Sequence, residues 1–191
     1  MVEHDLGDFD QAGQHYKQAI ALDDAKFPDG SERQIAPLVN LAMLQLNRGQ
    51  PKDALAFIDR AASIRQRELP EQHPSAGFIA HMRARTLLDL GKVQPAIEQF
   101  ELARQIRKNL ADGRHPHLAD TLIWLAKARQ RENERPSDEI VALAEEASQI
   151  SLDNRGPDDW RTLDIQLSVA CCSGPERPSE ARLWKHPRWI V

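Results

Sequence analysis

The stretch GQPKDALAFIDRAASI at residues 49–64 returns 42 residues later as GKVQPAIEQFELARQI at residues 91–106. The same offset in the other direction reaches GDFDQAGQHYKQAIAL at residues 7–22. The shared columns are Gly7/Gly49/Gly91, Ala12/Ala54/Ala96, Tyr16/Ile58/Phe100, Ala19/Ala61/Ala103 and Leu22/Ile64/Ile106. Because several independent positions agree at one offset, the chain is built from internal repeats.

The repeat continues beyond these three copies. The segment ARQI at 103–106 corresponds to ASQI at 147–150, at an offset of 44 residues. The two extra residues fit in the polar turn 132–137, since loops tolerate insertions best. His73-Pro74 also returns as His115-Pro116 at the offset of 42.

Each unit has the pattern of two helices. In the second unit Leu38, Leu41 and Ala42 follow helical spacing until Gly49, and Pro51 then suits the first turn of the next helix. Ala54 and Ala61 are small, which lets a paired helix approach closely. We therefore predict an all-α body of about eight helices. We place turns near Gly49, Gly91 and Asn133 and connections around Asp29, His73, His115 and Pro157.

The predicted layout is a repeat domain at 1–172, with units at about 1–30, 31–72, 73–114, 115–156 and a partial unit at 157–172. Gly7 is expected to close a first helix, so the chain opens with a second-type helix. Its apolar stripe is left half covered (Phe9, Ala12, Tyr16, Ala19, Ile20 and Leu22). Residues 173–191 form an irregular or disordered tail, or fold back as a cap through Trp184 and Trp189. A further interpretation is a slice of a longer solenoid or a truncated frame.

Composition narrows the function. The 191 residues carry a net charge of −4, 28% charged and only 5% aromatic residues, which disfavours a β-sandwich or barrel. No apolar run could span a bilayer, and the first residues lack a signal-peptide pattern. We expect a cytoplasmic protein that binds neither nucleic acid nor membrane.

The candidate chemical groups favour structure over catalysis. His73 and His115 share a repeat column, and His117 and His81 are not spaced to form a zinc pair on one helix face. Cys171 and Cys172 are adjacent and unsuited to a shared metal. No phosphate loop, nucleophile elbow or zinc-protease motif occurs. We therefore expect no metal, no cofactor and no enzymatic activity.

The columns Leu41-Ala42, Gly49, Ala54, Ile58 and Ala61 resemble the tetratricopeptide repeat. The 42-residue spacing and the His-Pro step are similar to the variety found in kinesin light chains and in many bacterial regulatory proteins. Residues 152–163 are similar to its Gly-Pro-Asp-His-Pro linker, with Asp159 where His is usual. Arg83, Gln166 and Asn133 depart from the pattern. The resemblance implies an α/α superhelix of about three and a half to four helix-pair repeats.

By the same resemblance, the first helices of each pair line a concave groove. The candidate groove residues are Asn40, Met43, Asn47, Phe78, His81, Arg85, Trp124, Lys127 and Arg131. The Asn40 amide could pair with an extended peptide backbone. Met43 and Met82 offer adaptable apolar contact. Trp124 is either an anchor for a ligand or a packing residue between units.

The charge of this groove predicts the ligand. Arg85, Lys127 and Arg131 outnumber the groove carboxylates Asp89 and Asp120, which predicts an acidic segment as the ligand. His81 is expected to add positive charge below neutral pH.

These features predict a non-catalytic scaffold that binds a peptide or protein segment in the groove. One alternative is a regulatory C-terminal arm of a larger enzyme, such as a bacterial serine/threonine kinase or an ATPase regulator. Another is a structural piece that self-associates through its open ends. The Lys and Asn set by which related repeats hold chaperone tails is missing, because Val39, Met43, Met82, Asp120 and Trp124 occupy those columns.

Overall fold

The computed structural model describes residues 2–71, 73–110, 115–132 and 137–173, with side chains from residue 9 to residue 169. Within these residues it contains eight α-helices, one short 3-10 turn and no strand. The helices are α1 (Val2–Asp24), α2 (Ile35–Asn47), α3 (Pro51–Glu68), α4 (Ser75–Asp89), α5 (Val93–Lys108), α6 (Pro116–Glu132), α7 (Asp138–Arg155) and α8 (Trp160–Ser173), and the 3-10 turn η1 (Glu32–Gln34) precedes α2. The all-helical prediction is confirmed.

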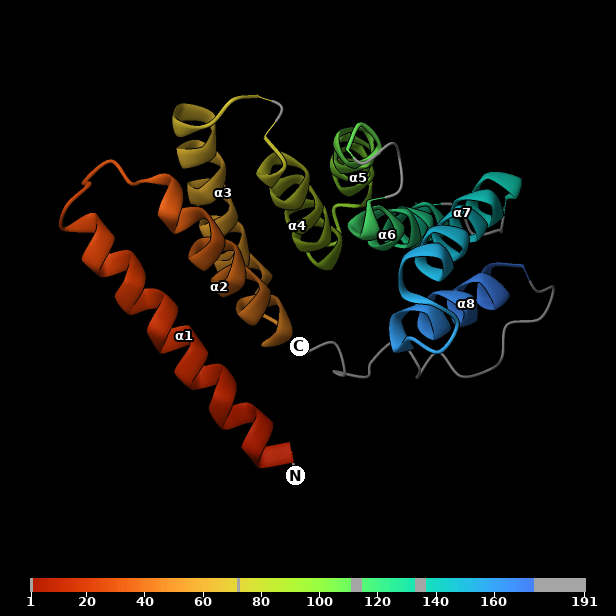
Figure 1. Cartoon of the computed structure of the whole chain (residues 1–191), viewed down its shortest axis with the longest axis horizontal. Helices are drawn as coiled ribbons and strands as arrows, with labels where there is room; N and C mark the ends of the chain where they lie inside the picture. The colour runs from red at the N-terminus through yellow and green to blue at the C-terminus, as the bar shows by residue number, and fades with distance from the viewer. Residues whose placement is uncertain (1, 72, 111–114, 133–136, 174–191) are drawn as a thin grey trace.

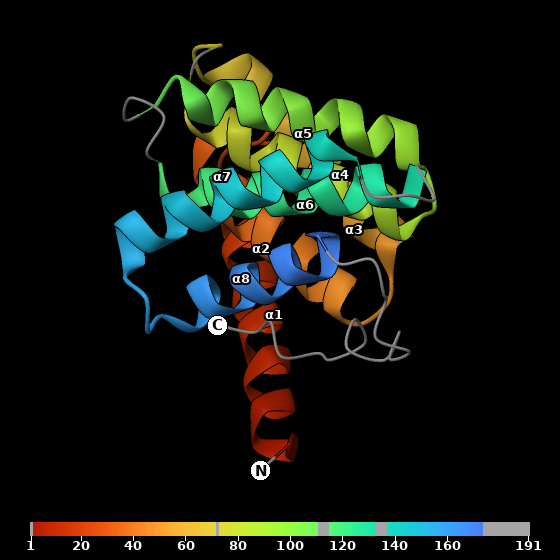
Figure 2. The ribbon, with the colours of Figure 1, turned by 90° about the vertical axis from the view of Figure 1, so that its right-hand side faces the viewer.

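The helices are stacked side by side along an arc (Figure 1). Helices α2, α4, α6 and α8 lie on the inner side of this arc and are called the inner helices here. Helices α1, α3, α5 and α7 lie outside them and are called the outer helices. In the side view α1 runs steeply across the direction of α5, α6 and α7, so the stack twists as it advances (Figure 2). This is the geometry of a helical solenoid.

Two glycines make the predicted turns in the same way. Gly49 and Gly91 have φ angles of 70° and 74°, a left-handed conformation that glycine adopts at little cost. The amide after each glycine closes the helix end: Gln50 N donates to Gln45 O at 2.8 Å, and Lys92 N donates to Leu87 O at 2.9 Å. This is the Schellman ending of a helix. The turn predicted at Asn133 lies outside the described residues.

Gly7 does not make such a turn, and this prediction was wrong. Helix α1 begins at Val2 and continues through Gly7 to Asp24. A glycine inside a helix costs about 1 kcal/mol relative to alanine but does not by itself end the helix. Helix α1 is nevertheless an outer helix, as the repeat columns predicted.

The apolar core consists of two clusters that meet in α4. One runs from Ile20 to Met82, and the other runs from Ala84 to Ile165. The alanines at Ala61 and Ala103 and the larger residue Phe100 are fully buried, as the close approach of paired helices requires.

The two His-Pro steps begin inner helices. Ser75 N donates to His73 Nδ1 at 3.3 Å, and His117 N donates to His115 Nδ1 at 3.2 Å. Each imidazole thus accepts a backbone N–H that the first helical turn leaves unpaired. The structural role predicted for the two histidines is confirmed by this shared contact.

The arginines near the ends of the outer helices hold the connections. Arg65 donates to the Pro70 carbonyl at 2.7 Å, and Arg67 donates to the Asp29 carbonyl. Their position alone predicts only a favourable charge at the helix end. The structure instead uses them to bind specific loop carbonyls.

The two ends of the repeat body differ from the expected layout in small ways. Helix α8 ends at Ser173, one residue later than the predicted repeat domain. The predicted tail beyond it, including Trp184 and Trp189, lies outside the described residues. At the other end, Ile20 is buried and Tyr16 is partly buried, whereas Leu22 is exposed. No helix in the described parts of the chain is both long and apolar enough to cross a membrane.

Candidate interaction surface

The nine predicted groove residues all lie on inner helices. Helix α2 carries Asn40, Met43 and Asn47, helix α4 carries Phe78, His81 and Arg85, and helix α6 carries Trp124, Lys127 and Arg131. Their side chains differ in accessibility. His81 is buried, Asn47 and Phe78 are exposed, and Arg131 lies near the exposed end of α6.

Two cationic side chains lie close to the indole ring of Trp124. The Arg85 guanidinium carbon lies 4.5 Å from the ring centroid, and Lys127 Nζ lies 5.0 Å from it. Arg85 comes from α4, whereas Lys127 follows Trp124 by one turn of α6. Trp124 also packs against the C-terminal core cluster. Both interpretations of Trp124 are therefore compatible with its position, and the three residues are called the Trp124 cluster below.

Arg85 has no carboxylate within ion-pair distance among the described residues. Its Nε is buried and has no hydrogen-bond partner there either. Burial lowers the pKa of the guanidinium, and the more distant Asp89 and Asp120 charges oppose this effect. A cation without a direct counter-ion gains most from an anionic ligand.

Two carboxylates, Asp89 and Asp164, lie near this cluster. Burial raises the pKa of Asp89, although Arg85 and Arg131 oppose the shift. Burial likewise raises the pKa of Asp164 on α8, against the charge of Lys127. Arg131 donates to the Leu88 carbonyl at 3.3 Å. The surface therefore runs from α4 across α6 to α8.

His81 is not a groove contact, and its prediction needs correction. Its side chain is only 6% exposed and stands edge-on to Phe100 of α5, with ring centroids 5.5 Å apart. Burial lowers its pKa well below the ordinary value, and the charges of Arg107, Arg85 and His117 lower it further. His81 therefore stays neutral where it was expected to gain charge.

Met82 was also expected to contact the ligand, but it is buried in the N-terminal core cluster. Asn40, Met43 and Asn47 lie on α2, which is separated from α6 by α4 (Figure 1). The structure thus brings Arg85, Trp124 and Lys127 together and leaves the α2 residues as a separate, uncharged part of the inner side.

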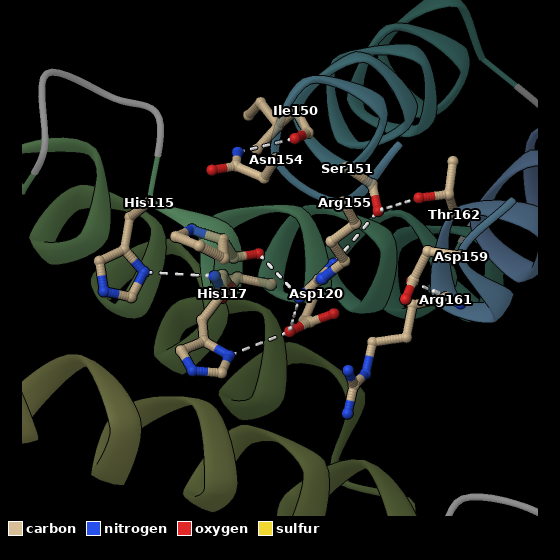
Figure 3. A network of polar contacts seen from close by, with 12 residues as sticks. His115, His117, Asp120, Ile150, Ser151, Asn154, Arg155, Asp159, Arg161 and Thr162 are labelled. Atoms are coloured by element: carbon tan, nitrogen blue, oxygen red, sulfur yellow. Dashed lines mark hydrogen bonds and ion pairs between the residues drawn. The ribbon is translucent and has the colours of Figure 1, made fainter. Parts of the chain in front are cut away.

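A polar network beside the cluster was missed by sequence reasoning (Figure 3). Arg155, at the end of α7, donates to the Pro116 carbonyl at 3.3 Å and to Asp120 at 3.4 Å. Its other amino group donates to Ser151, whose hydroxyl lies 3.0 Å from that of Thr162. This network links α6, α7 and α8.

The network also includes the carboxylate of Asp120. Burial would raise the pKa of this carboxyl, but the His117 hydrogen bond and the charges of Arg155 and Arg107 lower it overall. The carboxylate is therefore ionised and engaged within the protein. Its position in a groove column gave no sign of these partners, because Arg155 lies 35 residues away in the chain.

Arg107 is the second group that the sequence did not identify. It is buried, donates to the His117 carbonyl at 2.7 Å and also donates to the Thr121 hydroxyl. Burial lowers its pKa to about 10, and the charge of Asp120 opposes the shift. The repeat column Arg65/Arg107 was a possible signal, but it did not distinguish a partly buried arginine from a buried one.

A hollow of about 1000 Å³ lies elsewhere, along α5 and the end of α6. Its lining includes Glu101, Leu102, Arg104 and Arg129. Here the charges satisfy one another: Arg129 pairs with Glu101 at 2.7 Å, and Arg104 pairs with Glu101 at 3.4 Å. This hollow is therefore a poorer candidate for a charged ligand than the Trp124 cluster. The described residues contain no group of three or more potential metal ligands.

Comparisons with known proteins agree with this geometry. Two family models, both described as tetratricopeptide repeat, match residues 1–26 and 33–109. A search of curated protein sequences found no match.

Two similar solved structures come from Podosopora anserina, and both are described as crystal structures of putative kinesin light chain nearly identical TPR-like repeats. One, a variant with a single glutamine-to-methionine substitution, has 26% identity, a TM-score of 0.66, and coverage of 87% of this chain and 77% of that one. The other, described without that substitution, has 27% identity, a TM-score of 0.64 and coverage of 87% and 78%. The repeat columns, the stacked helix pairs and these matches together show that the chain is a tetratricopeptide-repeat protein of the kinesin-light-chain-like type.

Proposed function

We propose that this protein is a non-catalytic scaffold that binds an acidic peptide or protein segment along its inner helices. The observation that carries the proposal is the Trp124 cluster, in which Arg85 and Lys127 flank one aromatic ring. An aromatic anchor with arginine beside it is typical of residues that dominate binding energy.

The cluster combines two kinds of contact. The indole of Trp124 offers apolar area at little cost in side-chain entropy, and the cation above it fixes the ring. The Arg85 guanidinium could then receive a ligand carboxylate while it remains stacked on the ring. Charges at the edge of such a surface mainly set the association rate and its salt dependence.

The test is a peptide array in which each acidic peptide has a partner with Glu replaced by Gln. The wild-type chain should retain Glu peptides in preference to their Gln partners. Arg85→Glu with Lys127→Glu should weaken binding by about tenfold or more and reverse the effect of salt.

The matched control reverses two exposed lysines at the starts of outer helices, Lys52→Glu with Lys92→Glu. It makes the same change in net charge but lies away from the Trp124 cluster. If both double variants lose binding equally, the effect reflects net charge alone, and the proposed surface is wrong.

A further inference from the structure

The two ends of the described solenoid expose opposite halves of one helix pair. Helix α8 is an inner helix, and no outer helix follows it among the described residues. Helix α1 is an outer helix, and no inner helix precedes it in that part of the chain. The repeat columns identify the residues of each end helix whose counterparts are covered elsewhere in the body.

On α8 the uncovered residues are Leu163 and Leu167, with exposed fractions of 47% and 67%. The repeat offsets of 44, 42 and 42 residues relate Leu163 to Ala119, Gly77 and Ile35, and Leu167 to Ile123, His81 and Val39. All six of these counterparts are buried. The two leucines therefore occupy core columns that lack their usual cover.

The cover in the body of the protein is the following outer helix. A side chain added at Gly77 of α4 would lie 3.2 Å from Ile106 of α5. His81 of α4 meets the ring of Phe100, also from α5. The face of α8 that carries Leu163 and Leu167 is thus shaped to receive an outer helix of this repeat.

Helix α1 likewise exposes residues whose counterparts in the other outer helices are covered. Ala19 is exposed, whereas its counterparts Ala61, Ala103 and Ala147 are completely buried. Leu22 is 72% exposed, whereas in the same column Ile64 is buried and Ile106 and Ile150 are partly buried. Tyr16 shares its repeat column with Phe100, and Leu22 shares its column with Ile106. Phe100 and Ile106 both face the preceding inner helix, α4.

We propose that α8 of one copy of this chain packs against α1 of a second copy, as the inner and outer helices of one repeat pair. By the contacts between α4 and α5, Leu167 would meet Tyr16 of the second copy, and Leu163 would meet its Leu22. The pairing would bury the columns of Leu163, Leu167, Tyr16 and Ala19, which the three complete pairs also bury, and the column of Leu22, which those pairs bury fully or in part.

This contact joins two different surfaces, so it is heterologous and adds copies head to tail. Each added copy leaves one free α1 face and one free α8 face. The assembly therefore grows with concentration rather than stopping at a dimer. It leaves the inner side with the Trp124 cluster unused, so it is independent of the proposed ligand site.

The test uses the full 191-residue chain in sedimentation velocity over a wide concentration range. Two variants block one face each: Leu163→Glu with Leu167→Glu on α8, and Ala19→Glu with Leu22→Glu on α1. The wild type should exceed the mass of a dimer of the 21.6 kDa chain as concentration rises. Each blocked variant alone should remain monomeric, because a charge in an apolar contact is costly.

An equal mixture of the two blocked variants gives the decisive result. One variant keeps a free α1 face and the other a free α8 face, so the mixture should form a dimer and nothing larger. Formation of that dimer also shows that both variants are folded. Leu102→Glu, at a similarly exposed leucine of α5, is the control and should assemble like the wild type.

Three outcomes would overturn the pairing of α8 with α1. One is a wild-type chain that stays monomeric at every concentration, as expected if another segment covers α8. A second is association of either blocked variant alone, which would mean that like faces pair. The third is a mixture that remains monomeric while the wild type assembles.

Discussion

The N-terminal and C-terminal halves of the solenoid use the same repeat columns but bury different chemistry. From α1 to the middle of α4 the core is aliphatic, and Gln34 is the buried polar residue among those described. From His81 onward the buried residues include an arginine and several hydroxyl groups (Arg107, Thr86, Thr121, Ser151, Thr162 and Ser168). The charged Trp124 cluster lies on this second half.

The difference shows how a repeat fold separates packing from function. Alanines and large apolar residues at fixed columns define the helix pairs in both halves. Where polar groups replace apolar ones, they are accommodated by hydrogen bonds such as that from Arg107 to the His117 carbonyl. The C-terminal half can therefore carry charge at its inner side without losing the fold.

The largest expected effect compares the same column in the two halves. Phe100→Ala should cost about 3–5 kcal/mol of the free energy of unfolding, and Ile58→Ala about 2–5 kcal/mol. Both side chains are fully buried, but Phe100 also covers His81. Urea unfolding of both variants measures the two costs. A smaller loss for Phe100→Ala would contradict its role at the centre of the C-terminal half.

Overpacking should affect the two halves equally. Ala61→Leu and Ala103→Leu each place a larger side chain where paired helices touch, and each should cost about 1–3 kcal/mol. Both alanines are completely buried. Thermal unfolding provides the measurement, with Ala56→Leu at an exposed position of α3 as the control. An unchanged melting temperature in either buried variant would show that the helices do not meet there.

The pH dependence of stability should be specific to the C-terminal half. The pKa of His81 is lowered in the folded protein, so the unfolded chain takes up the proton first as the pH falls. The contribution of neutral His81 is therefore complete above the ordinary histidine pKa of about 6.5 and declines as the pH falls toward the folded-state value.

His81→Ile, which introduces the residue found at Ile123 in the same column, should remove this component. Chemical unfolding at a series of pH values from neutral to mildly acidic compares the two proteins. If the wild type and the variant lose stability in parallel, His81 is not the group responsible.

The sequence predicted the repeated elements well because their signals are local and recur. Gly49 and Gly91 ended helices as expected, since the same φ requirement is met twice. The prediction of a turn at Gly7 failed because Gly7 shares its repeat column with Gly49 and Gly91, whereas helix α1 continues through it. A glycine permits a turn but does not require one.

The candidate site was harder to predict because burial depends on neighbouring repeats. His81 was placed in the groove by its column, but Phe100 and α6 enclose it. Trp124 of α6 contacts Arg85 of α4. No local sequence pattern reveals a contact between two different helices. The residue types at the site were predictable, whereas their partners required the three-dimensional structure.

We propose that the C-terminal inner helices bind the acidic segment, and not α2 or the hollow along α5 and the end of α6. The most direct test is an NMR titration of the ¹⁵N-labelled chain with the best-retained Glu peptide from the array, with the Trp124 indole signal assigned through Trp124→Phe. We expect the Trp124 indole N–H and Arg85 Nε–H signals to shift first and saturate together, while the Asn40 and Asn47 side-chain amides change little. Saturable shifts confined to the residues around Leu102, or to α2, would contradict it.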